Sequence, residues 1–139
     1  MAFELAPAFV PTSHAVCDLP LCHVRLQADA RYSWLVLIPR AEGLVEIEDL
    51  APGPRAQLMD ELVRAGAAVR AIGAALGRPV EKLNVGQLGN VTPQLHVHVV
   101  GRRTDDPAWP GPVWGVPGAE AFAPDALQRS LAAARKALG

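Results

Sequence analysis

Apolar residues in the middle of the chain follow a helical pattern. One series is spaced alternately by four and three residues: Leu58, Leu62, Ala65, Val69, Ile72 and Leu76. This spacing places them on one stripe of a helix, which can lie across the face of a sheet. Pro54 suits the first turn of that helix, and Gly77 suits the position just past its end. The pattern therefore predicts a helix over residues 54–76.

Shorter segments on either side of this helix have the patterns of strands. Residues 14–38 indicate two or three strands, with alternating apolar positions first and a continuous apolar run over residues 34–38. Two more strands are predicted over residues 81–86 and 94–100. Strands that follow one another so closely should pair antiparallel, since a parallel pair needs a long crossover.

The last part of the chain predicts a loop and a second helix. Residues 105–118 are rich in Pro and Gly and carry Trp109 and Trp114, whose rings suit packing of the loop better than stacking on a base. Residues 124–138 repeat leucine and alanine at helical spacing. Together the elements predict an α+β fold in a single domain over residues 1–139. It is an antiparallel β-meander sheet crossed by one long helix, plus a C-terminal helix.

Composition and charge narrow the class of protein. The 139 residues include 13 basic and 14 acidic side chains, scattered without blocks, for a net charge of −1. This balance argues against binding to nucleic acid or to an anionic membrane surface. The apolar runs are too short to span a bilayer, and the first residues lack the pattern of a secretory signal. We therefore expect a cytoplasmic protein in which Cys17 and Cys22 are reduced.

The segment with the most chemical potential is residues 94–100. If it is a strand, Gln94, His96 and His98 share one face, while the apolar residues between them point into the core. An imidazole can serve as a base, a nucleophile or a metal ligand, and a protonated neighbour could supply charge to a phosphate oxygen. Spacing alone leaves three interpretations open: a catalytic site, a metal site, or a polar patch whose hydrogen bonds are satisfied.

Residues 94–100 resemble the signature of the histidine triad family, in which three histidines alternate with apolar residues. Six of the seven positions match, and the first histidine is replaced by Gln94. The surrounding order is also similar: an apolar strand ending in Pro39, a long helix, a strand with Asn84, and a Gly-rich turn over residues 86–90. The resemblance implies an α+β fold, usually a homodimer, that binds nucleoside phosphates and cleaves or transfers at the α-phosphate.

The resemblance also assigns roles to individual side chains. His96 matches the central histidine, which attacks phosphorus and forms a nucleotidyl-histidine intermediate, and His98 matches the last one, which contacts the phosphate. Gln94 can exchange hydrogen bonds in the first position but cannot titrate. No metal or cofactor is required by this chemistry. The residues expected to bind substrate are Asn84, Asn90, Thr92 and Gln27. The family acid that grips the ribose should fall near residue 26, which is Leu26, and Gln27 or Asp29 could substitute for it.

Three functions follow in order of preference. The first is a nucleotidyl hydrolase or transferase that acts on a dinucleoside polyphosphate or a nucleoside phosphoramidate. The second is a nucleotide-binding module that has lost turnover through the replacement at Gln94. The third is a metal protein that uses His96 and His98 as ligands with His14 or His23, although no acid or cysteine stands at ligand spacing.

Overall fold

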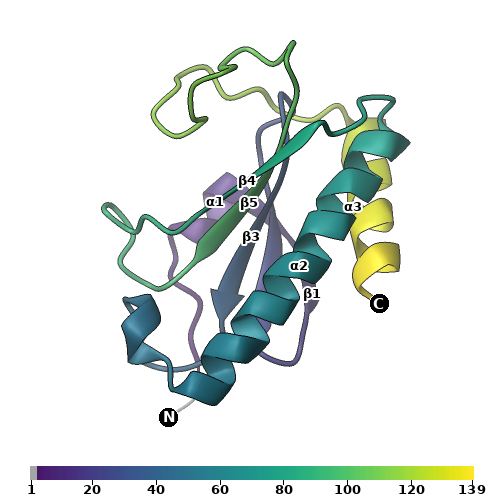
Figure 1. Ribbon diagram of the computed structural model, residues 1–139. Helices are drawn as coiled ribbons and strands as arrows, with labels where there is room; N and C mark the ends of the chain where they lie inside the picture. The colour runs from purple at the N-terminus through teal and green to yellow at the C-terminus, as the bar shows by residue number, and fades with distance from the viewer. Residues whose placement is uncertain (1–2) are drawn as a thin grey trace.

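The computed structural model describes residues 3–139 and consists of one sheet with helices on both sides (Figure 1). The strands are β1 (Ser13–Asp18), β2 (Cys22–Gln27), β3 (Ser33–Pro39), β4 (Lys82–Gly86) and β5 (Val97–Arg102). The helices are α1 (Phe9–Thr12), the 3-10 helix η1 (Ile47–Asp49), α2 (Pro52–Ala75) and α3 (Pro124–Leu138). All neighbouring strands pair antiparallel in the order β1-β2-β3-β5-β4, so β5 lies between β3 and β4. This confirms the predicted α+β fold.

The two long helices pack on the same face of the sheet (Figure 1). Their apolar stripes meet the inward side chains of the central strands in one buried core, to which α2 contributes Leu58, Val69 and Ile72. Gly101 of β5 lies under α2, where an added Cβ would stand 2.9 Å from the Cγ1 atom of Val69. The absence of a side chain there lets the helix approach the sheet closely. In the described residues, no helix combines the length and the apolar character needed to cross a bilayer.

The opposite face of the sheet is covered by the N-terminal segment with α1 and by the loop after β5 (Figure 1). A second apolar cluster fills this layer and includes Phe9, Trp34 and Val113. A buried ion pair between Arg102 and Asp106, whose side chains are 1% and 4% exposed, stabilises the start of this loop. Both faces of the sheet are therefore covered by other parts of the chain.

The predicted strand over residues 94–100 is displaced in the structure. β5 begins at Val97 and continues to Arg102, so the three residues before Val97 lie outside the sheet. Continuing the register of β3 and β5 would bring Pro39 opposite Leu95, and proline has no N–H to donate to the ladder. Leu95 instead donates its backbone N–H to the carbonyl oxygen of Leu44. The helix predicted over residues 54–76 extends from Pro52 to Ala75, and the one over residues 124–138 has the expected bounds.

Candidate active site

His96 and His98 lie together on the sheet face opposite α2. Their ring centroids are 4.9 Å apart, and the ring planes are at 76°. Both rings line an open cavity of about 330 Å³, together with the turn over residues 88–92 and Trp114. The prediction that these two imidazoles share one patch is therefore confirmed by the geometry. The cavity gives a small molecule access to both rings.

The imidazole of His96 is held in one tautomer by its own backbone. Its Nδ1 atom lies 2.7 Å from the carbonyl oxygen of Gln94. A carbonyl oxygen can only accept, so Nδ1 carries the proton and the lone pair of the neutral ring is on Nε2. The ring is buried, with 6% of the residue exposed, and it packs edge to face against Phe9 at 4.9 Å. A fixed ring with a free Nε2 lone pair is suited to act as a nucleophile or a base.

His98 is held in the opposite tautomer by Trp34. The indole N–H of Trp34 donates to Nδ1 of His98 at 3.0 Å. Because an indole N–H can only donate, Nδ1 of His98 must be unprotonated and the proton of the neutral ring is on Nε2. Burial lowers the pKa of His98 to about 4, and the nearby His96 contributes to the same shift. His98 is therefore neutral at neutral pH and offers an N–H dipole, which corrects the expectation that the imidazole beside His96 could be protonated.

Trp114 forms one wall of the cavity. Its ring packs edge to face against His98 at 5.6 Å and against Trp34 at 6.4 Å. The indole approaches the backbone of β4 at Gly86, where an added Cβ would stand 2.9 Å from the Cη2 atom of Trp114. Gly86 also pairs with His98 across the sheet. The loop after β5 thus contributes directly to the site, and not only to the packing of the second layer.

Comparison with known proteins identifies the family. The model of the HIT domain matches residues 9–105, which include every element that lines the cavity except the Trp114 loop. The chain belongs to the histidine triad family. Proteins of this family are generally nucleotide-binding hydrolases or transferases.

Several solved structures of histidine triad proteins are similar over the whole chain. One from Bradyrhizobium japonicum is 40% identical, with a TM-score of 0.93 and 100% of both chains covered. Another, from Sinorhizobium meliloti 1021, is 36% identical, with a TM-score of 0.88 over 98% of this chain and 97% of that chain. A third, from Marinobacter aquaeolei VT8, is 32% identical, with a TM-score of 0.86 over 99% of this chain and 97% of that chain. No curated protein sequence matches the chain.

The residues expected to bind substrate are divided between three places. Asn90 and Thr92 line the cavity beside the two triad imidazoles. Asn84 lies on the same face of the sheet, but its Oδ1 accepts a hydrogen bond from Arg102 at 2.8 Å and it does not line the cavity. Gln27 ends β2 and pairs with Ser13 of the edge strand β1, away from the histidines. Two of the four predicted residues are thus brought to the triad and two are not.

Gln94 does not converge with the two imidazoles, contrary to the strand pattern. Its Oε1 accepts a hydrogen bond from the backbone N–H of Ala6, and its Nε2 donates to the carbonyl oxygen of Glu4, both at 2.8 Å. The alternation of a strand does not apply here, because β5 begins only at Val97. At the triad, Gln94 contributes its backbone carbonyl to His96, while its side chain binds the N-terminal segment.

A metal site built on the triad lacks ligands. Within residues 3–139, no group of three His, Cys, Asp or Glu side chains is placed to hold a metal ion. His23, expected as a possible third ligand, bonds Asp18 through Nδ1 at 2.7 Å. His14 belongs to β1, which is separated from β5 by two strands. Neither histidine joins His96 and His98.

Sequence reasoning missed Trp34, and it interpreted Trp114 as a residue that packs the loop, whereas Trp114 lines the cavity. Trp34 reaches His98 because β3 and β5 are adjacent, with Trp34 paired to Val100 and Val36 paired to His98. A correct register between these two strands would have revealed the contact. Trp114 is brought in by a loop of irregular backbone, for which the sequence contains no periodic signal.

Proposed function

We propose that this protein is a nucleotidyl hydrolase or transferase that acts at the α-phosphate of a nucleoside phosphate, with His96 as the nucleophile. The observation that carries the proposal is the hydrogen bond from Nδ1 of His96 to the Gln94 carbonyl. This bond leaves the Nε2 lone pair of a fixed imidazole available at the cavity. A structural role in packing alone does not explain why two adjacent imidazoles both line an open cavity.

The reaction proceeds in two displacements. Nε2 of His96 attacks phosphorus, the bond to the leaving group breaks, and the electron pair departs with that group. The ring becomes an imidazolium whose Nδ1–H is stabilised by the Gln94 carbonyl. The Nε2–H of His98 donates to a non-bridging phosphoryl oxygen as negative charge develops there. Water then attacks phosphorus, the bond to Nε2 breaks, and the nucleotide leaves while one proton of the water passes to solvent.

The remaining polar groups of the cavity suit a bound nucleotide. Asn90 and Thr92 offer an amide and a hydroxyl for the phosphate or the sugar. The ring of Trp114 offers an apolar wall against which a base or ribose can pack. Asn84 and Gln27 take no part in this scheme, and neither does a metal or a cofactor.

The test is to trap the intermediate. Protein treated with chelator is mixed with a diadenosine polyphosphate or an adenosine phosphoramidate, quenched, and mapped by mass spectrometry. We expect a nucleotidyl adduct on His96 and a loss of turnover in His96→Ala on the order of 10³-fold or more. His14→Ala removes a histidine outside the cavity and serves as the control. Tight nucleotide binding without turnover or adduct would instead identify a binding module, and activity that zinc restores would identify a metal enzyme.

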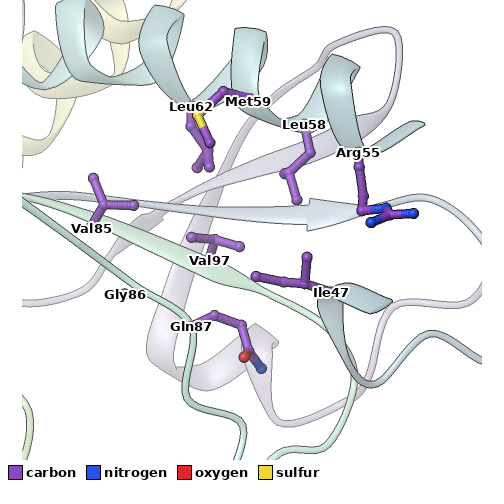
Figure 2. Close-up of a pocket in the computed structure, with 9 residues that line it drawn as sticks. All are labelled: Ile47, Arg55, Leu58, Met59, Leu62, Val85, Gly86, Gln87 and Val97. Carbon is purple, nitrogen blue, oxygen red and sulfur yellow. The ribbon is translucent and has the colours of Figure 1, made fainter. Parts of the chain in front are cut away.

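We further propose that two copies of the chain associate through α2 and β4. β4 is one of the two edge strands of the sheet, at the end opposite β1. Beside it Met59, Val63 and Val85 are 61%, 69% and 54% exposed, an unusual grouping of apolar side chains on one surface. Figure 2 shows the pocket under this surface, with Met59 and Leu62 of α2 facing Val85 of β4. A second copy of the same surface would cover these groups and the open edge of the sheet.

Sedimentation of two matched variants tests this association. Val63→Lys places a charge in the proposed interface, whereas Val10→Lys places one on an equally exposed valine of α1, on the other side of the sheet. We expect the first variant to be monomeric and the second to sediment as the wild type, as a dimer. A monomeric wild-type protein at micromolar concentration would contradict the proposal.

A further inference from the structure

The hydrogen bond between Trp34 and His98 determines what kind of donor His98 can be. Trp34 is 7% exposed, and the only polar atom of its side chain, Nε1, donates its hydrogen bond to Nδ1 of His98. An indole has no acceptor and does not titrate in the range where proteins are folded. Nδ1 of His98 therefore cannot take up a proton without losing this partner. Trp34 thus fixes the tautomer of the neutral ring and opposes protonation of its Nδ1 atom.

In the part of the chain that the structure describes, no titratable group other than His96 contacts the ring of His98 to pass it a proton. The rings that contact His98 are His96, Trp34 and Trp114. Across the sheet it is paired with Val36 on one side and Gly86 on the other. Among these described contacts, His96 is thus the one titratable group, and His96 is the proposed nucleophile. Burial, with a smaller contribution from His96, lowers the pKa of His98 to about 4, which agrees with this geometry.

A neutral imidazole with its proton on Nε2 stabilises charge without transferring a proton. It can donate a hydrogen bond to a phosphoryl oxygen, but its N–H is far too weak an acid to protonate a leaving group at neutral pH. This separates the two substrate classes that the proposed function leaves open. When a phosphoanhydride is cleaved, the P–O electron pair remains on a phosphate oxygen and no proton is needed. When a P–N bond is cleaved, the amine nitrogen must be protonated to leave.

We propose that Trp34 is a positioning residue which restricts the site to phosphoanhydrides, such as dinucleoside polyphosphates, by fixing the proton of His98 on Nε2. This inference rests on the proposed function for its substrate, although the proton position is a property of the free protein. The bond that forms is from Nε2 of His96 to phosphorus, and the bond that breaks is P–O. The leaving nucleotide or phosphate departs as an anion.

Proton placement is measured first, by long-range ¹H–¹⁵N correlation in the histidine rings without any substrate. In the wild type we expect His98 to be neutral, with its proton on Nε2, from pH 8 down to about pH 5. Trp34→Phe keeps an aromatic ring but has no N–H, so the Nδ1–H tautomer should appear. Trp109→Phe alters a tryptophan outside the cavity and should leave His98 unchanged. A wild-type ring that is charged at pH 6, or that carries its proton on Nδ1, would overturn the proposal.

Leaving-group selectivity is measured second. The kcat/KM value is measured for an anhydride and for a phosphoramidate of the same nucleoside. Each value is divided by the rate at which free imidazole attacks that compound, which removes the difference in intrinsic reactivity, and the normalised ratio compares the two quotients. A general acid typically contributes on the order of 10²–10⁴-fold, so we expect the normalised ratio to favour the anhydride by about 100-fold or more at pH 7. Turnover of the phosphoramidate should rise as the pH falls, because its proton comes from solvent.

Replacing Trp34 by a titratable ring should change this ratio specifically. Trp34→His provides an N–H donor that can also carry a proton, so the normalised preference for the anhydride should fall by at least tenfold. Equal preference in the wild type, Trp34→Phe and Trp34→His would refute the role of Trp34. A protein that forms no adduct with either substrate would refute the proposed function instead, and the ring spectra would still decide whether Trp34 fixes the proton of His98.

Discussion

The side-chain amide of Gln94 holds the N-terminal segment against the triad. Replacing this side chain should lower the free energy of unfolding by a measurable amount. The amide makes two hydrogen bonds to backbone groups 88 and 90 residues away in sequence, at Ala6 and Glu4. A typical bond of this kind contributes about 0.5–1.5 kcal/mol net, so Gln94→Ala should lower the free energy of unfolding by about 1–3 kcal/mol. Gln128→Ala, on an exposed glutamine of α3, is the matched control.

A histidine at position 94 should restore only part of this stability. The amide presents its donor and its acceptor side by side at one end, whereas the two nitrogens of an imidazole point in divergent directions. Gln94→His can therefore keep one of the two bonds and should lose about half as much free energy as Gln94→Ala. Introducing the histidine that stands at this position in the family signature is thus expected to lower the stability of this chain.

Urea unfolding and hydrogen exchange together test this reasoning. Unfolding gives the total free energy, and exchange at the backbone N–H of Ala6 reports the local contact, because that N–H is the donor to Gln94. In Gln94→Ala the Ala6 amide should exchange faster than in the Gln128→Ala control. Unchanged protection of Ala6, with stability equal to that of the control, would show that the amide does not hold the segment.

Two further predictions concern the loop that carries Trp114. Asp106→Ala leaves the buried guanidinium of Arg102 without its carboxylate and should cost about 3–5 kcal/mol in urea unfolding. Burial alone would raise the pKa of Asp106, but hydrogen bonds from Arg102 and the backbone outweigh it and lower the pKa below the usual 3.8. The stability from this carboxylate is therefore fully present above pH 4 and is lost as the pH falls through the lowered pKa, so wild type and Asp106→Ala should converge in acid. Gly86→Ala would place a Cβ 2.9 Å from the ring of Trp114 and should displace it from His98, seen as a shifted tryptophan emission with reduced turnover; unchanged emission would contradict the packing.

The helices could be predicted from the sequence because their signals are local. The stripe in α2 and the residues 124–138 of α3 repeat at helical spacing, and Pro54 and Gly77 mark the ends of the first helix. The start of β5 could not be predicted in this way, since the alternation of apolar and polar residues continues back to Gln94. What ends the ladder is Pro39 on a strand far away in sequence, which a pattern within residues 94–100 cannot reveal.

The candidate site was only partly predictable for a related reason. All seven residues of β3 are buried, because both faces of the sheet are covered, so the run gives no sign of which face Trp34 occupies. Asn90 and Thr92 were also placed by the resemblance, at positions just before the triad in sequence, and they do line the cavity. Gln27 was placed by resemblance alone and lies on β2, which β3 separates from β5, and the partners of Gln94 lie at the opposite end of the chain.

The ion pair between Arg102 and Asp106 also stands at the boundary between β5 and the loop that carries Trp114. The strand that ends at Arg102 carries His98, while the loop that starts beyond Asp106 supplies the Trp114 wall. We therefore expect sequence changes between residues 107 and 118 to alter this wall of the cavity while His96 and His98 keep their positions. Exchanging this segment with that of a relative would test whether the wall selects the ligand.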